Sequence, residues 1–485
     1  MQDRSLLALQ DLLGAVNGTL FNEKTRDASF LSVCIDSRRA LSGSLFIAVP
    51  GSQSDGHAFI KDAVDKGASL IMAMRSSVGE FGTLYEKLAD RGIPVVLTDN
   101  TLNALQKAAG LYVSRFSALK KIGVTGSSGK TTVKECIGSI LSQKYRVIIN
   151  EGNLNSETGL PLSVFKIDKT HEAAVFEMGM NRRGEIKELA DVLFPQTAVI
   201  TNIGSAHIGI LGTKDKIAEE KKQIFSNFTE DCTGFVPAED PYKDFLMSGV
   251  PGRMHSFGIG KEYGIEDVRD RGVKGSEFYY KGVKIDFPLC GIHNLKNAAC
   301  ALAVAEHFGL NAEEIKTGLE AVRPLAGRMQ ILEGAPTVVH DCYNANPDSM
   351  NAAVDFFDEA AHEGRKVLIL GDMGELGAES ASSHKKLVQR AAVSKADILV
   401  FAGHSFCAAY DAVCRELSGP FAEGKRVLFL PDISDAALTS FGEKLASVLH
   451  EGDLILIKAS RSTALERFIP IIQKKSIQNP MEDDG

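Results

Sequence analysis

Residues 119–141 (LKKIGVTGSSGKTTVKECIGSIL) constrain the fold more than any other segment, because they join an apolar strand to a helix through a glycine-rich loop. Glycines in such a loop let backbone N–H groups turn toward phosphate oxygens, and the positive end of the helix dipole adds to the attraction. Lys130 would lie along the β and γ phosphates, and the Thr131 hydroxyl would ligate Mg²⁺. The segment predicts an ATP site made of Thr125, Gly126, Ser127, Ser128, Gly129, Lys130, Thr131 and Thr132.

The loop departs from the longer phosphate-loop pattern at one position, since Val124 stands where that pattern has its first glycine. The shorter TGxxGKT form keeps both the backbone cradle and the lysine. The alternative is a chance turn rich in glycine and serine, but the strand before it and the helix after it favour phosphate binding. The loop alone does not tell whether phosphate passes to water, to a hydroxyl or to a carboxylate.

Short apolar runs alternate with helical stretches along the chain, whose 485 residues exceed the size of a single core. We expect an α/β protein of three domains. Residues 1–105 predict a small N-terminal α/β domain with strands in SLFIAVPG and GIPVVLTD and a helix in AFIKDAVDKGA. Residues 106–325 predict a central, doubly wound parallel sheet that carries the phosphate loop.

The third predicted domain covers residues 326–485 and has its own Rossmann-like sheet. Helical sequence follows each of its five strand-like runs, which are TVVHD, KVLILGD, DILVFAG, RVLFLPD and DLILIKAS. Pro324 and Gly327 mark a hinge between the second and third domains.

The composition excludes several classes of protein. A net charge of −8 argues against a nucleic-acid binder that relies on a basic surface. Eight cysteines form no CxxC pair, so we expect reduced thiols and neither disulfides nor a zinc cluster. The chain has no apolar run of about 18 residues and no secretory-type N-terminal segment, which predicts a cytoplasmic protein without membrane insertion.

Two polar residues follow central strands at the sheet edge where ligands of doubly wound folds bind. Glu177 ends the run AAVFE, and His207 follows TAVITNIGSA. Taken singly, Glu177 would cap a turn and His207 would be a core histidine. Together with Thr131 they would face one phosphate-lined crevice.

Lys221 lies in the predicted helix 213–225, within the same arc as the apolar residues Ile217, Ile224 and Phe225. A long side chain that reaches out to water would explain this position. A lysine held inward would instead have a lowered pKa and a nucleophilic neutral amine. Reaction of that amine with CO₂ would give a carbamate, an oxygen donor suited to Mg²⁺.

Eight segments occur in the order found in the Mur ligase family, which the chain resembles over nearly its whole length. They are TGSSGKTT, EGNLNSETGLPLS, FEMGMNRRGEI, NIGSAH, GIHNLKNA, GRMQ, DCYNANPDS and LGDMGELG. YNANPDSM and LGDMGELG are similar to segments of the MurF type, and the DNPR-like segment of the MurE type is absent.

The resemblance implies a reaction. D-Alanyl-D-alanine would be joined to UDP-N-acetylmuramoyl-tripeptide at the expense of ATP, through an acyl phosphate, with release of ADP and phosphate, in peptidoglycan precursor synthesis. The first domain would bind the UDP end of the precursor, the second ATP and the third the dipeptide. A monomer is expected.

The resemblance also implies roles for residues. Lys130, Glu177, His207 and Lys221 would be catalytic, with one Mg²⁺ on Thr131 and Glu177 and a second on His207 and carbamylated Lys221. Asn294 and Asn297 would face adenine, although without the family they could equally cap a helix. Arg328 and Asp341 would reach the nucleotide from the third domain, where isolated charges are otherwise surface residues.

Substrate contacts are implied at eight further positions. Candidates for the uridine end are Ser37, Gly56 and His57 in residues 35–59, and Asn155 would lie near the γ phosphate. Asn344 and Asn346 would contact the dipeptide, although an Asn-rich turn is the plain alternative. Ser460 and Arg461 close the last strand, where Arg461 would pair with a substrate carboxylate or with an internal acid.

Three other functions compete with this one. A related ligase would add a single amino acid, or glutamates to a folate, and a phosphate-loop kinase would phosphorylate a hydroxyl. A nucleotide-binding regulator without activity is the third, but the presence of Lys130, Glu177, His207 and Lys221 argues against it.

Overall fold

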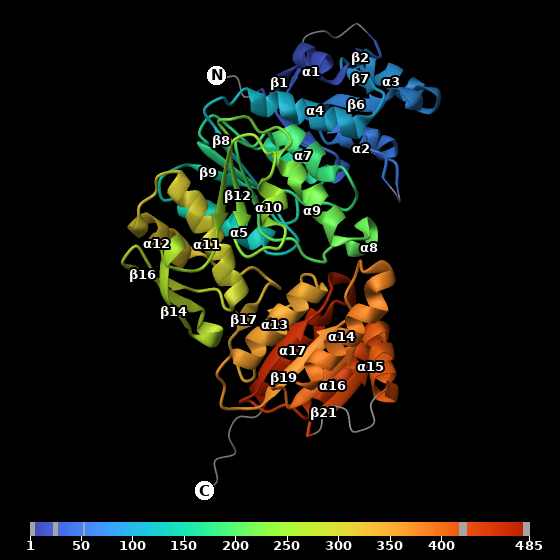
Figure 1. Cartoon of the computed structure of the whole chain (residues 1–485). Coiled ribbons are helices and arrows are strands. Elements are labelled where there is room, and N and C mark those ends of the chain that lie inside the picture. Colours follow the sequence, from blue (N-terminus) through green and yellow to red (C-terminus); the bar gives the residue numbers. More distant parts are fainter. Residues whose placement is uncertain (1–4, 23–27, 52–53, 417–423, 479–485) are drawn as a thin grey trace.

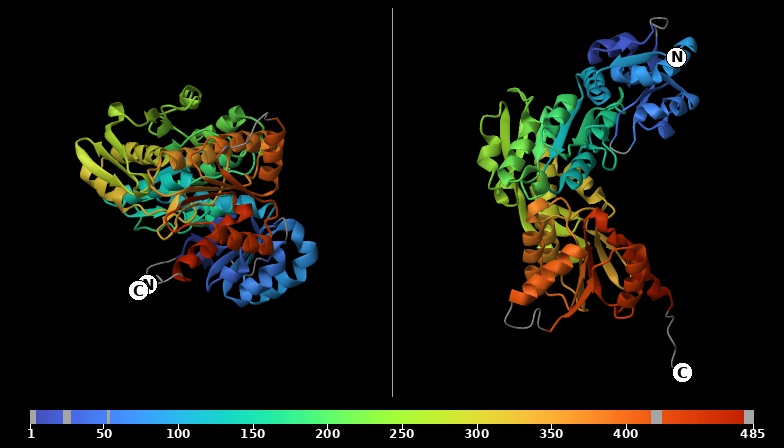
Figure 2. Two further views of the ribbon diagram at one scale, coloured as in Figure 1. Left: turned by 90° about the horizontal axis from the view of Figure 1, so that it is seen from below. Right: turned by 90° about the vertical axis from the view of Figure 1, so that its right-hand side faces the viewer.

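The computed structural model describes residues 5–22, 28–51, 54–416 and 424–478, which form three α/β bodies that follow one another along the molecule (Figures 1 and 2). No helix within these ranges is long and apolar enough to cross a membrane. All eight cysteines are free thiols, and six of them are buried, as the sequence predicts.

The first body has a sheet of five strands, of which β2 alone runs antiparallel to its neighbour. In sheet order the strands are β2 (Thr19–Leu20), β7 (Val95–Thr98), β6 (Ala68–Met74), β5 (Ser44–Ile47) and β4 (Ser32–Cys34); β1 (Leu7–Ala8) pairs with β3 (Ser29–Phe30). Its helices are α1 (Leu9–Val16), α2 (Ile60–Asp65), α3 (Val78–Asp90) and α4 (Thr101–Ser114).

Helix α4 runs through residue 105, where the sequence places the first domain boundary. Its buried face joins the core under the first sheet to the core of the central body. The Tyr112 hydroxyl donates to the Ile167 carbonyl at 2.5 Å. The division at residues 105 and 325 stays a prediction, and α4 is shared between the first two bodies.

The second body is built on the predicted parallel sheet, with helices on both faces. In sheet order its strands are β13 (Arg253–Phe257), β12 (Thr233–Pro237), β11 (Thr197–Ile200), β8 (Lys120–Thr125), β10 (Ala173–Glu177) and β9 (Val147–Ile149). One face is covered by α5 (Lys130–Leu141), α11 (Ile292–His307) and α12 (Ala312–Ala321). The other carries α6 (Gly159–Val164), α7 (Glu185–Leu193), α9 (Lys214–Lys222) and α10 (Lys243–Met247).

A small antiparallel sheet, which the sequence does not predict, lies beside the central body. It consists of β14 (Ile265–Asp270), β15 (Ser276–Tyr280) and β16 (Val283–Phe287), and it packs its apolar face on the α5 side of the core. β14 (IEDVRD) is largely charged and exposed, so its apolar alternation is weak, whereas β16 (VKIDF) alternates apolar and charged residues.

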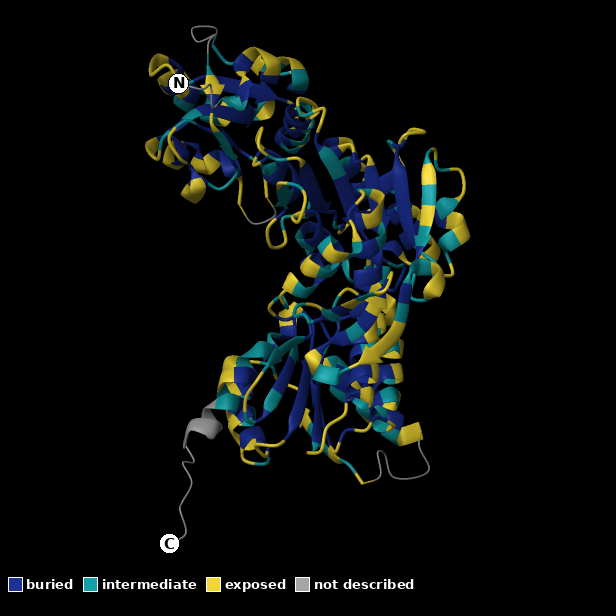
Figure 3. Ribbon diagram, turned by 90° about the vertical axis from the view of Figure 1, so that its left-hand side faces the viewer, coloured by how far each residue is buried: buried dark blue, intermediate teal, exposed yellow. Residues whose placement is uncertain are grey.

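The third body confirms the five predicted strands and adds an antiparallel edge strand, β17 (Gln330–Leu332). The sheet continues with β18 (Thr337–Asp341), β22 (Leu454–Lys458), β19 (Lys366–Gly371), β20 (Ile398–Ala402) and β21 (Arg426–Leu430). Its helices are α13 (Pro347–Glu359), α14 (Ser380–Ala392), α15 (His404–Glu416), α16 (Asp435–Ala446) and α17 (Phe468–Gln478). The inner strands of both large sheets lie in the buried interior, while the edge strands β9, β13, β17 and β21 are partly exposed (Figure 3).

Candidate active site

The phosphate loop connects β8 to α5, as the sequence predicts, and two glycines give it its shape. Gly126 and Gly129 have φ angles of 153° and 79°. A Cβ at Gly129 would lie 2.3 Å from Oδ1 of Asn297, so α11 leaves no room for a side chain there. Asn202 holds the loop through both backbone groups of Ser128, each at 3.0 Å. The loop is therefore held between Asn202, which follows β11, and Asn297 on α11.

Glu177 ends β10 directly beside the start of α5. Its Oε2 accepts the Thr131 hydroxyl at 2.7 Å, and its Oε1 accepts the Asn155 amide at 2.6 Å. The Asn150 side chain accepts from the Glu177 N–H at 2.9 Å and donates to its carbonyl at 3.0 Å. Both carboxylate oxygens are thus aimed by neutral donors that a cation could replace.

His207 precedes the short helix α8 (Ile208–Leu211) and has a left-handed backbone, with a φ of 65°. Its Nδ1 lies 2.8 Å from a carboxylate oxygen of Glu375, which belongs to the third body. The hydrogen bond with His207 lowers the pKa of the Glu375 carboxyl. The residue expected as a metal ligand is therefore held from across the domain junction.

Lys221 points inward and is 1% exposed, which decides between the two interpretations that its helical position left open. Its Nζ donates to the Gly126 carbonyl at 2.9 Å, and Lys130 Nζ reaches the same oxygen at 2.9 Å. Burial, and then the charge of Lys130, hold the pKa of Lys221 well below its usual value. Its neighbour Lys222 donates instead to carbonyls near α10 and is partly exposed.

A cavity of about 840 Å³ lies where the second and third bodies meet. Of the predicted nucleotide and metal residues, it is lined by Ser127, Ser128, Gly129, Lys130, Thr131, Thr132, Glu177, His207, Asn294, Asn297, Arg328 and Asp341. Thr125, Gly126 and Lys221 do not line it. Thr125 donates to the Met178 carbonyl at 2.9 Å and so ties the end of β8, where the loop begins, to the residue after β10.

The nucleotide-facing candidates come from two bodies. Asn294 and Asn297 occupy the first two turns of α11 and do not cap it, since Gly291 is the residue before the helix. Asn294 donates to the Cys290 carbonyl at 2.9 Å and accepts from Asn297 at 3.1 Å. From the third body, the Arg328 guanidinium lies 3.7 Å from the centre of the Tyr343 ring.

Asp341 forms a buried ion pair with Lys458 at 2.6 Å, and both residues line the cavity. Asp341 also accepts the Met329 N–H at 3.2 Å. Lys458 ends the strand next to β18, so the carboxyl ends of two parallel strands bring this pair to the sheet edge. Asp341 is therefore not an isolated surface acid, because Lys458 balances its charge.

The dipeptide candidates divide into two groups. Asn344 and Asn346 line the cavity, and Asn346 caps α13 through the Ser349 N–H while its Nδ2 lies 3.4 Å from the Ser128 hydroxyl. Ser460 and Arg461 do not line it. Ser460 accepts the Gly374 N–H at 2.6 Å, and Arg461 is exposed and pairs with Glu466 at 3.3 Å, which is the internal pairing.

The uridine candidates lie in the first body, apart from the cavity. His57 is buried, with Nδ1 at 2.6 Å from Asp55 and Nε2 accepting the Met74 N–H at 2.9 Å. Both ring nitrogens therefore serve the fold of this body. Ser37 and Gly56 are buried as well, and a Cβ at Gly56 would meet the Val49 backbone at 2.7 Å.

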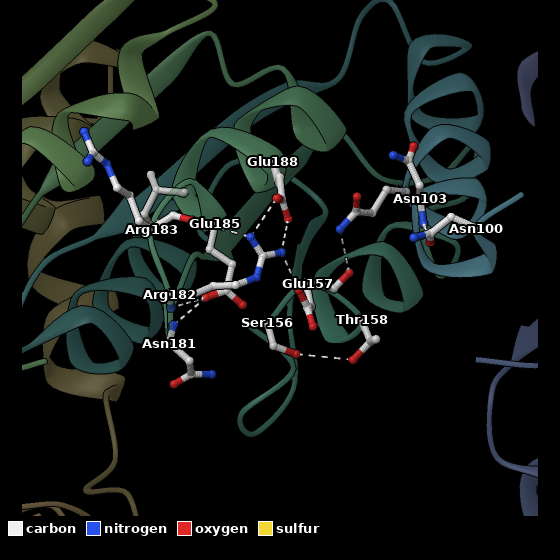
Figure 4. Close-up of polar contacts among 12 residues, drawn as sticks. Asn100, Asn103, Ser156, Glu157, Thr158, Asn181, Arg182, Arg183, Glu185 and Glu188 are labelled. Atoms are coloured by element: carbon white, nitrogen blue, oxygen red, sulfur yellow. Dashed lines mark hydrogen bonds and ion pairs between the residues drawn. The ribbon is translucent and has the colours of Figure 1, made fainter. Parts of the chain in front are cut away.

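The loop just after Asn155 is held by a polar cluster between α4 and α7, in which Glu157 and Glu188 lie around Arg182 (Figure 4). The Arg182 guanidinium donates to Glu157 at 2.6 Å and to Glu188 at 2.8 and 2.6 Å. Gln106 of α4 donates to the Glu157 carbonyl at 3.2 Å. The loop that carries Asn155 is thus tied to the helix shared with the first body.

Several cavity residues have no counterpart among the sequence predictions. They include Asn153, Asn202, His293, Tyr343, Asp348, Glu375 and Lys458. Lys458 ends β22, within the predicted run DLILIKAS, and carries the one signal available in advance, a charge at the ligand edge of a sheet. The others are polar residues in loops or first helical turns, where their type is ordinary.

Among the described residues, the oxygen atoms of Thr131 and Glu177 are the one place in the cavity where the side chains suit Mg²⁺, a hard cation. No group of three or more His, Cys, Asp or Glu side chains in the described ranges is arranged to hold a metal ion. Mg²⁺ would therefore need hydroxyl and phosphate oxygens beside Glu177, and Thr131 supplies the hydroxyl. An unmodified Lys221 ammonium has no lone pair, so that side chain fits a metal only as a carbamate.

Comparison with known proteins gives consistent matches along the chain. Models of the Mur ligase family catalytic domain, the Mur ligase middle domain and the Mur ligase glutamate ligase domain match residues 30–112, 124–305 and 327–461. The UDP-N-acetylmuramoyl-tripeptide--D-alanyl-D-alanine ligase of Treponema pallidum is 42% identical, over 97% of this chain and 100% of that protein. The Bacillus subtilis ligase of the same name is 32% identical, over 98% and 99% of the two chains.

Solved structures agree with these relatives. MurF from Acinetobacter baumannii superposes with a TM-score of 0.82 at 29% identity, over 96% of this chain and 98% of that one. MurF from Thermotoga maritima, in complex with ADP, gives 0.75 at 29% identity, over 92% and 98%. The three domain matches and the full-length relatives together show that this chain belongs to the Mur ligase family and is of the MurF type.

Proposed function

We propose that the protein joins D-alanyl-D-alanine to UDP-N-acetylmuramoyl-tripeptide, with ATP converted to ADP and phosphate. The observation that carries the proposal is a cavity lined by both the phosphate loop and the third body. The Asn346 contact to Ser128 brings the start of α13 to the loop itself. Relatives named for this reaction are similar over nearly the full chain.

The chemistry requires activation, because a carboxylate is a poor electrophile. The terminal carboxylate of the tripeptide attacks the γ phosphorus of ATP, the bond to the β-phosphate oxygen breaks, and an acyl phosphate and ADP result. The dipeptide amine then attacks the acyl carbon, loses a proton and expels phosphate. Lys130 stabilises the negative charge that spreads over the transferred phosphoryl oxygens.

The remaining residues position the reactants. Asn294 and Asn297 would face adenine, Arg328 and Asp341 would reach the nucleotide from the third body, and Asn155 would lie near the γ phosphate. A cavity enclosed between two bodies would keep water from the acyl phosphate. The first body would hold the uridine end through residues near Ser37, Gly56 and His57.

Two Mg²⁺ ions would neutralise phosphate charge when bound. Thr131 and Glu177 would hold one, and His207 and carbamylated Lys221 the other. The support for carbamylation is a buried lysine with a lowered pKa below the phosphate loop. A cytoplasmic monomer is part of the proposal, and both nucleotide substrates belong to the cytoplasm.

The test supplies purified protein with ATP, Mg²⁺, the tripeptide nucleotide and D-alanyl-D-alanine, and follows ADP release together with the mass of the product. ADP and the pentapeptide nucleotide should form only when all three substrates are present. Lys130→Met should abolish both products, while Lys144→Met, just beyond α5, should keep them. The absence of dipeptide-dependent ADP release would refute the proposal.

The same assay separates the alternatives. A ligase for a single amino acid would release ADP with free amino acids or glutamate in place of the dipeptide. A kinase would yield a stable phosphorylated product and no amide. The pairing of Asn346 with Ser128 favours a reaction completed by the third body, which a simple phosphate-loop kinase does not need.

A further inference from the structure

The loop that carries His207, residues 203–211, is hydrogen-bonded to the third body on both sides of the histidine. The N–H and the hydroxyl of Ser205 both donate to Oδ2 of Asp348 at 2.6 Å. The Gly209 N–H donates to the Glu375 carbonyl at 3.1 Å. In Figure 1, α8 at the end of this loop lies next to the third body.

Two glycines make this approach possible. A Cβ at Gly204 would lie 2.6 Å from Oδ2 of Asp348. A Cβ at Gly209 would lie 2.6 Å from both the Glu375 carbonyl oxygen and the Gly377 nitrogen. The second clash is with backbone, which has no rotamer to change, so the contact requires glycine at position 209.

We propose that Asp348 is a positioning residue: it fixes the His207 loop when the third body is docked, and so makes the placing of His207 depend on that body. Asp348 lies two residues after Asn346, which reaches the phosphate loop. The start of α13 therefore contacts both the phosphate loop and the His207 loop. The catalytic part of this inference rests on the proposed function, and the geometric part does not.

A plainer role for Asp348 is that of an acid in the first turn of α13, where it favours the helix dipole. That role needs a charge and no particular partner. The structure instead shows one carboxylate oxygen accepting two hydrogen bonds from Ser205, while Oδ1 lies 3.7 Å from Lys214. An amide oxygen could accept the same two bonds, so Asn at 348 separates the two roles.

The first test measures hydrogen exchange of residues 203–211 in the full-length protein. Asp348→Ala should speed exchange of the Ser205 and Gly209 amides by about tenfold or more, the scale of a hydrogen bond to a charged group. Asp348→Asn should stay close to the unaltered protein. The control is Asp355→Ala on the same helix, which removes an ion pair to Arg390 and should leave the loop unchanged.

The second test is kinetic, with all three substrates saturating. Asp348→Ala should lower kcat by about tenfold or more, because small displacements of a catalytic group are costly. The dissociation constant of ADP from Asp348→Ala should change by less than about twofold, since the phosphate loop is intact in this variant. Asp348→Asn should recover most of the rate, as a dipole role would not allow.

Gly209→Ala is a second variant that leaves α13 untouched, and it should reproduce the faster exchange and the lower kcat. Gly79→Ala, on an open face of α3, is its control. Unchanged exchange and kcat in both Asp348→Ala and Gly209→Ala would overturn the proposal, as would equal damage from Asn and Ala at 348. If the unaltered protein shows no dipeptide-dependent turnover, the proposed function fails, and the exchange experiment still decides this inference.

Discussion

Lys221 and Lys222 are adjacent and chemically identical, yet the fold gives them opposite surroundings. Lys221→Ala should lower the ligase rate by about a hundredfold or more, because it removes the group expected to carry an oxygen ligand near the phosphates. Added formate or acetate should restore part of the rate by supplying a carboxylate oxygen. Lys222→Ala should keep the rate, and the extra 44 Da of a carbamate should be present in the unaltered protein and in Lys222→Ala and absent from Lys221→Ala. A fully active Lys221→Ala variant would contradict the metal-ligand role.

His293 predicts a pH dependence of stability. Burial lowers its pKa to about 4, with Asp341 opposing that shift and Lys458 adding to it. Since the unfolded chain then binds the extra proton between about pH 6.5 and pH 4, this histidine destabilises the fold as the pH falls through that window. Acidification to about pH 5 should therefore lower the free energy of unfolding of His293→Gln by about 1–2 kcal/mol less than that of the unaltered protein. Thermal unfolding at pH 7.5 and pH 5 checks it, with exposed His404→Gln as the control.

The sequence identifies residues whose type is unusual for their place and misses those whose type is ordinary. Lys221 is predictable because a lysine within an apolar arc is uncommon. Glu375 and Asp348 are not, since acids in a loop and in a first helical turn have sufficient local reasons to be there. Their partners, His207 and Ser205, are more than 140 residues away in the chain, so only the folded structure pairs them.

At the scale of elements, the start of α13 combines a helix cap with a contact to the phosphate loop. Asn346→Ala should lose about 1 kcal/mol of stability, because the cap to Ser349 is lost. Asn346→Asp should keep the cap and lose only the amide contact to Ser128. We therefore expect the aspartate variant to unfold like the unaltered protein while its kcat falls, and the alanine variant to lose both.

Asn311→Ala is the matched control for this pair. Asn311 caps α12 in the central body with a capping box of the same kind. Its loss should cost a similar stability, about 1 kcal/mol, without any change in kcat. Equal kinetic loss in Asn311→Ala and Asn346→Ala would show that the Ser128 contact has no role of its own.

Elements with strong periodicity are those that the sequence predicts. The buried parallel strands of the central and third bodies are continuous apolar runs, and the structure confirms them. In the sheet β14–β16 the signal is uneven, since β16 (VKIDF) alternates apolar and charged residues and β14 (IEDVRD) is mostly charged and exposed. Pairing with β15, and not its own apolar pattern, makes β14 a strand.

At the scale of the molecule, the cores divide the chain differently from its sheets. One core runs from the first sheet through α1 and α4 to the α7 face of the central sheet. The third body has two cores of its own, and within the described residues one of them includes residues of the central body: buried Cys290, with the partly buried Ile208 and Val273 packed against it. The first two bodies are therefore expected to unfold as one unit and the third as another.

Calorimetry and hydrogen exchange of single variants test this division. Leu105→Ala in α4 should cost about 2–5 kcal/mol and lower the transition of the first two bodies together, because its cavity opens in their shared core. Val354→Ala in α13 should lower the transition of the third body and leave the other in place. ADP should raise the unfolding temperature of the first two bodies, since the phosphate loop belongs to that unit. If Leu105→Ala loosened the first body alone, the boundary predicted at residue 105 would also be the energetic boundary, and the shared core would not couple the two bodies.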